Sequence, residues 1–91
     1  MNKEKLEVKV GDFFKIRAYE NISLSDSKLT SFITFGKEIF IIILELEYNK
    51  KIKNLLPPYW ENVILHRVLC DNSKIVLIRK EWFVMEYATK L

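Results

Sequence analysis

The chain carries an uninterrupted apolar run in its middle, residues 39–44, which continues as Glu45-Leu46-Glu47-Tyr48. Its β-branched residues favour a strand, and the run is far shorter than the roughly 18 apolar residues of a membrane span. Glu45 and Glu47 share one face of such a strand. The alternation therefore points the even positions into the core: Phe40, Ile42, Leu44, Leu46 and Tyr48. The odd positions then face outward and need a cover: Ile39, Ile41 and Ile43.

Three surfaces could cover that outer face: a second copy of the chain, another protein, or the chain's own segment 20–35. If the face is an interface, Ile41→Lys weakens assembly more than it weakens folding. Unfolding of this variant would instead place the face in the core.

Shorter patterns predict further strands. Residues 6–10 alternate as in a half-buried strand, a turn follows at Gly11-Asp12, and residues 13–19 alternate again. In the latter, one face is apolar: Phe14, Ile16 and Ala18. Residues 20–31 are polar and indicate a long surface loop, in which Ser25 or Asp26 could cap one helical turn. Residues 32–35 predict a short strand before a turn at 36–38.

The second half of the chain predicts a hairpin. Apolar segments 59–70 and 75–78 flank Asp71-Asn72-Ser73-Lys74, which is a typical turn sequence. Before these segments, Pro57-Pro58 is incompatible with a helix or a central strand. For residues 82–87 we expect a turn and then a strand, although their spacing also fits a helix. Residues 1–91 thus form a single all-β domain of about five antiparallel strands.

This order of elements resembles the small SH3-like barrel proteins encoded by tailed bacteriophages and other viruses. The residues that carry the resemblance are Gly11-Asp12-Phe13-Phe14-Lys15-Ile16, the long polar loop, Gly36, the hairpin 68–76, and Glu81-Trp82. It covers residues 8–87 and implies a small SH3-like barrel that acts as an accessory or assembly protein without enzymatic activity. The chain has no glycine after Gly36, which departs from the nucleic-acid-binding members of that fold.

The charge is uneven along the chain. Residues 1–48 carry 7 basic and 8 acidic side chains, whereas residues 49–91 carry 8 and 4. A basic patch for phosphates could therefore form in the second half: Lys50, Lys51, Lys53, Arg79 and Lys80. Aromatic residues could stack on bases or line a peptide groove: Tyr59, Trp60 and Trp82.

Catalytic chemistry is not expected. His66 is the only histidine and shares a face with Ile64 and Val68, which indicates a packed side chain. Cys70 lies about 13 Å from His66 at ~3.3 Å per residue, too far to be activated by it. One His and one Cys cannot build a zinc site, and Glu45 and Glu47 indicate solvated edge charges. We therefore expect no cofactor, no metal and no small-molecule substrate.

The single cysteine fits a reducing compartment, and no secretory signal or spanning segment is expected. We thus expect a cytoplasmic protein, in the host cytoplasm or the virion if viral. Its expected function is non-enzymatic interaction or assembly, with a protein partner or a second copy of itself bound through the apolar strand face and surface aromatics. The alternatives are a nucleic-acid-binding barrel and a small inhibitor of a host enzyme.

Overall fold

The computed structural model describes residues 5–25, 28–33 and 37–91, and over these residues all regular structure is strand or short 3-10 turn. The strands are β1 (Phe13–Ile16), β2 (Glu20–Ser25), β3 (Lys28–Ile33), β4 (Ile39–Glu45), β5 (Leu65–Cys70), β6 (Ile75–Arg79) and β7 (Ala88–Lys90). The 3-10 turns are η1 (Tyr48–Lys50), η2 (Lys53–Leu55), η3 (Pro58–Trp60) and η4 (Lys80–Trp82). The predicted all-β class is confirmed.

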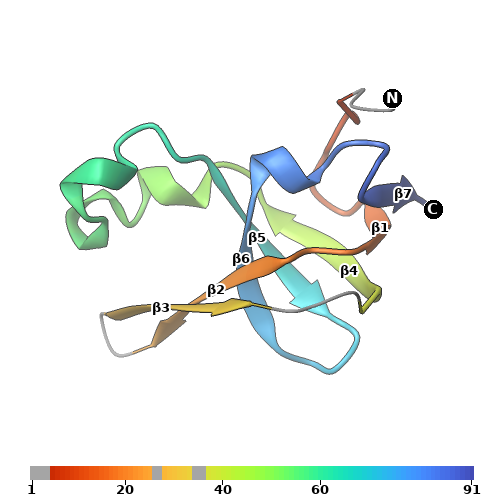
Figure 1. Ribbon diagram of the computed structural model, residues 1–91, viewed down its shortest axis with the longest axis horizontal. Coiled ribbons are helices and arrows are strands. Elements are labelled where there is room, and N and C mark those ends of the chain that lie inside the picture. Colours follow the sequence, from red (N-terminus) through yellow and green to blue (C-terminus); the bar gives the residue numbers. More distant parts are fainter. Residues whose placement is uncertain (1–4, 26–27, 34–36) are drawn as a thin grey trace.

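All seven strands belong to one antiparallel sheet, in the order β3-β2-β6-β5-β4-β1-β7. The sheet has two edges, β3 and β7, so it is open, and it has seven strands where the sequence predicts about five. Between β2 and β6 the strand register contains a single residue pair, Ile22 with Leu77. Figure 1 shows the green segment 48–60 at one end of the molecule and β7 at the other.

Two hydrophobic clusters hold the sheet. The larger contains Phe14, Ile16, Ala18, Ile41, Ile43, Val68, Cys70, Ile78, Phe83 and Ala88. The smaller contains Ile22, Ile52, Leu65 and Leu77. In the larger cluster, the rings of Phe14 and Phe83 meet edge to face at 5.4 Å, a favourable aromatic geometry. The predicted inward face of residues 13–19 is confirmed, because Phe14, Ile16 and Ala18 are all buried.

The prediction for β4 assigned the wrong face to the core. Ile41 and Ile43 are only 2% and 1% exposed, and Ile39 packs against the same cluster, whereas Phe40 is 51% exposed. The cause is an irregularity in the pairing of β4 with β5 between Ile43 and Glu45. A β-bulge there places an extra residue in β4, so the alternation read from Glu45 and Glu47 changes face.

The predicted polar loop over residues 20–31 is also wrong, because this segment contains the hairpin β2–β3. Ile22 and Leu24 alternate with serines, which is the period of a strand, and Ile22 is fully buried in the smaller cluster. Burial against Leu65 and Leu77 outweighs the low strand propensity of the polar residues. Ser25 lies in β2 instead of capping a helical turn, and Asp26 lies outside the described residues, as does the segment 34–36.

The predicted hairpin around Asp71–Lys74 is confirmed as β5–β6, with Cys70 N–H donating to the Lys74 carbonyl at 2.8 Å. Residues 6–10 form no strand, although Leu6 and Val8 pack on the larger cluster as their alternation indicates. In residues 82–87 the predicted strand is displaced: η4 and a turn come first, and β7 begins at Ala88.

Candidate interaction surface

A row of apolar residues crosses four neighbouring strands on the face opposite the larger cluster. Phe13 of β1 pairs with Ile42 of β4, Ile42 with Leu69 of β5, and Leu69 with Ile75 of β6. Residues that pair directly in antiparallel strands project to the same side of the sheet. We call these four residues, together with Phe40 two positions before Ile42, the apolar row.

The apolar row is open to solvent. Phe13, Phe40 and Ile75 are 56%, 51% and 45% exposed, and Ile42 and Leu69 are half-buried. Leu91 extends the row at the edge, because its N–H donates to the Phe13 carbonyl at 2.9 Å and its side chain is 65% exposed. Single exposed apolar residues are ordinary, but a contiguous set across neighbouring strands is typical of an interaction site.

The remainder of this sheet face is covered by the chain itself. Leu65 and Leu77 lie on the same faces of β5 and β6 as Leu69 and Ile75, and they are buried in the smaller cluster. The cover comes from β2, β3 and the segment 48–63, whose partly buried members include Leu24, Leu29, Tyr48, Leu56, Trp60 and Val63. The chain thus covers the part of the face around Leu65 and Leu77. The residues of the smaller cluster do not extend over the apolar row.

Charged side chains border the apolar row. Lys15 pairs with Phe40 across β1 and β4, and both Lys15 and Arg17 contact the carboxylate of Glu38 at 3.5 Å. On the other side, the guanidinium of Arg67 lies 5.4 Å from the ring centre of Tyr48. A polar border around an apolar centre is the usual anatomy of a protein interface.

The three aromatic residues singled out from the sequence do not gather. Tyr59 is 81% exposed and touches Trp60, whose ring packs on the smaller cluster beneath the Arg79 guanidinium at 5.3 Å. Trp82 instead packs on the larger cluster and contacts Tyr19 and Tyr87. Of these three residues, Tyr59 alone is largely exposed.

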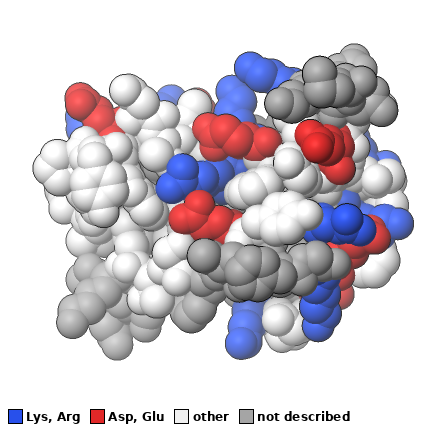
Figure 2. All heavy atoms as spheres, in the orientation of Figure 1, with Lys and Arg blue, Asp and Glu red and all other residues white. Residues whose placement is uncertain are grey.

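Three of the five basic residues proposed for a phosphate patch are paired with carboxylates. Lys50 contacts Glu47 at 3.1 Å, Lys51 contacts Glu45, and Arg79 contacts Glu20 at 3.2 Å. These pairs reduce the positive potential that a phosphate backbone would meet. Figure 2 shows charges of both signs interspersed on the displayed face, with a largely uncharged region at its left end.

His66 and Cys70 are packed side chains, as the sequence indicates. The His66 Nδ1 accepts a hydrogen bond from the Glu47 N–H at 3.1 Å, and only 5% of the residue is exposed. Burial, together with the positive charge of Lys80, lowers the pKa of His66. Burial also raises the pKa of the Cys70 thiol, which weakens it as a nucleophile. Within residues 5–25, 28–33 and 37–91, no cluster of His, Cys, Asp and Glu could hold a metal ion.

The apolar row escapes the sequence because it depends on register. Its members come from four strands, and nothing in their spacing along the chain places them together. The sequence does show that residues 39–44 are apolar on both faces. This pattern predicts that another surface covers the face that does not point into the core.

Comparisons with protein-family models, with curated proteins and with solved structures gave no match. In the described part of the chain, no helix is long and apolar enough to cross a membrane. The candidate surface therefore rests on the geometry of this chain alone.

Proposed function

We propose that this chain is a small non-enzymatic interaction protein that binds another protein through the apolar row. The observation that carries the proposal is the direct pairing of Phe13, Ile42, Leu69 and Ile75 across four strands on one open face. Binding would remove this apolar surface from water, at roughly 25 cal/mol per Å² of buried area.

The proposal revises the surface expected from the sequence. Ile41 and Ile43 are excluded as contact residues because they are core, and Phe40 and Ile42 take their place. Tyr59 remains a separate candidate contact because its ring is open, whereas Trp60 and Trp82 pack on different clusters. An SH3-like relationship and a viral accessory or assembly role are part of the proposal and rest on the sequence resemblance.

The experiment is capture of partners from native lysate with and without nuclease treatment, with wild type and a Phe13→Ser/Phe40→Ser variant compared in parallel. Both substitutions lie at positions more than 45% exposed, so the variant should stay folded. Met85→Ser is the matched control, because Met85 is 47% exposed and lies outside the apolar row. Sedimentation velocity on each protein measures self-association.

The proposal expects a stoichiometric protein that survives nuclease, is retained by Met85→Ser and is lost with the double variant. Self-association lost in the same variant would identify a second copy as the occupant of the row. A partner retained by the double variant would overturn the apolar row as the binding surface. Material that is lost with nuclease would move the function to nucleic-acid binding and make Lys53 and Lys80 the next residues to mutate.

A further inference from the structure

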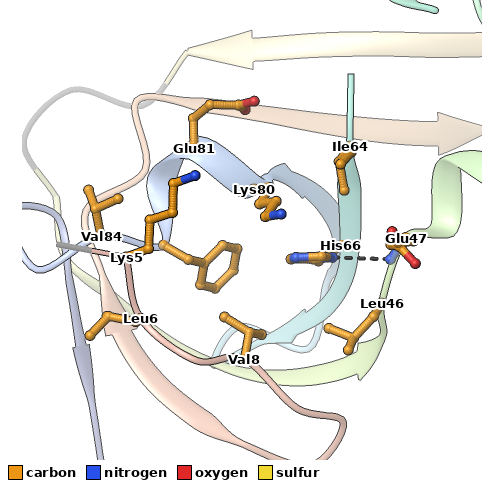
Figure 3. Close-up of a pocket in the computed structure, with 11 residues that line it drawn as sticks. Lys5, Leu6, Val8, Leu46, Glu47, Ile64, His66, Lys80, Glu81 and Val84 are labelled. Atoms are coloured by element: carbon orange, nitrogen blue, oxygen red, sulfur yellow. Dashed lines mark hydrogen bonds between the residues drawn. The ribbon is translucent and has the colours of Figure 1, made fainter. Parts of the chain in front are cut away.

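A pocket of about 410 Å³ lies between the N-terminal residues 5–8, the end of β4, the start of β5, and η4 (Figure 3). Much of its lining is apolar: Leu6, Val8, Leu46, Ile64, Phe83 and Val84. Its volume falls within the range of small-molecule sites, which typically combine an apolar wall with a few polar groups. The pocket is separate from the apolar row, because His66 and Leu69 project to opposite faces of β5.

His66 presents a hydrogen-bond donor to this pocket. Its Nδ1 accepts the N–H of Glu47, so a neutral imidazole carries its proton on Nε2. In Figure 3 the ring extends away from Glu47 toward the middle of the pocket. Of the hydrogen bonds between described residues, that from Glu47 is the one His66 makes, so Nε2 has no partner among them. Because His66 lines the pocket, this donor is available to an acceptor on a ligand.

Two lysines add positive charge to the same pocket. Lys5 and Lys80 both line it, and Figure 3 shows the Lys80 amine directed toward His66. Neither lysine forms an ion pair with a carboxylate of the described residues, whereas Glu47 is already paired with Lys50. Glu81 also lines the pocket, and in Figure 3 its carboxylate extends away from His66.

We propose that this pocket binds a small organic carboxylate with an apolar body. The carboxylate accepts from His66 Nε2–H and from Lys80, and the body packs against Phe83 and the aliphatic wall. Charge-assisted hydrogen bonds of this kind are stronger than neutral ones. The proposal does not depend on the apolar row or its partner.

The test uses octanoate as the probe, with 1-octanol and octylamine as probes of the same chain length. Two-dimensional NMR titration should shift the amide signals of residues around the pocket, including Leu6, His66 and Phe83. Octanoate is expected to bind at least tenfold more tightly than 1-octanol, and octylamine more weakly still. A bound carboxylate should also raise the pKa of His66, measured from its imidazole signals.

Two variants assign the polar contacts. Lys80→Met keeps the length and removes the charge, and should weaken octanoate about tenfold with little effect on 1-octanol. His66→Asn keeps an acceptor near the Nδ1 position for the Glu47 N–H and removes the Nε2 donor, so it should weaken octanoate as well. The matched control is Lys53→Met, which removes a lysine that does not line this pocket and should bind as wild type.

Three results would overturn the proposal. The first is octanoate and 1-octanol binding equally well, and the second is unchanged octanoate affinity in folded Lys80→Met. The third is the absence of shifts around the pocket at millimolar octanoate. If His66→Asn fails to fold, the Lys80→Met variant and the comparison of the three probes still test whether the pocket binds a carboxylate.

Discussion

The two faces of β4 have the same apolar character and opposite roles. Ile41 and Ile43 are almost completely buried in the larger cluster, whereas Phe40 is half exposed and Ile42 lies in the open apolar row. The inner face is held by neighbours from β1, β5, β6 and the C-terminal segment. The difference teaches that an apolar strand face becomes core or interface according to what the rest of the chain places against it.

The largest expected effect comes from a charge introduced on the inner face. Ile41→Lys should prevent cooperative folding, because a buried unpaired ammonium costs more than the free energy of unfolding of a domain this small. Ile42→Lys is the matched control, since it changes the same residue type at the adjacent position on the open face. Circular dichroism and urea unfolding distinguish them, and equal loss of structure in both would contradict the assignment of faces.

The next comparison is between the covered and open halves of the outer face. Leu77 is 2% exposed in the smaller cluster and Ile75 is 45% exposed in the apolar row, both on β6. Leu77→Ala should lower the free energy of unfolding by about 3 kcal/mol, because it leaves a cavity. Ile75→Ala should lower it by less than about 1 kcal/mol. Chemical denaturation measures both, and a similar loss in each would mean that the row is covered in the free protein.

A titration tests the inner face of β5, where His66 is surrounded by Lys80, Glu47 and Glu81. The pKa of His66 is lowered in the folded protein, so the unfolded chain takes up the proton first as the pH falls below about 6.5. The free energy of unfolding should therefore decrease as the pH is lowered from 7.5 to 5.5. The pKa values of Asp12 and Glu47 are also lowered, but they act at more acidic pH.

His66→Asn is the control for this pH dependence, because asparagine does not titrate. Urea unfolding midpoints at the two pH values should differ for wild type and nearly coincide for the variant. A wild-type midpoint that does not change with pH would show that His66 titrates alike in the folded and unfolded chain.

The smallest expected effect is at the turn that leads into β1. Gly11 has φ +90°, a conformation that L side chains rarely adopt, and its N–H donates to the Ile43 carbonyl at 2.8 Å. A Cβ there meets no atom within 4 Å, so Gly11→Ala acts through backbone strain alone. We expect a loss of about 1 kcal/mol in the free energy of unfolding. A neutral or stabilising result from thermal unfolding would place this turn outside the cooperative fold.

Alternation along the chain predicted much of the local structure. It identified the inward face of Phe14, Ile16 and Ala18, the hairpin at Asp71–Lys74, and the packed position of His66. It failed over residues 20–31, where their polar composition concealed the alternation of Ile22 and Leu24. Propensity is a weak guide when two apolar residues are enough to dock a hairpin on a cluster.

The sequence by itself determined that the chain is all-β and that residues 39–44 form a strand with two apolar faces, because β-branched residues favour a strand and no polar residue alternates with them. Only the tertiary structure decided which face is core, because the bulge between Ile43 and Glu45 changes the side to which alternate residues point. The apolar row and the His66 pocket likewise join residues from several segments, and their proximity follows from strand register and turn packing.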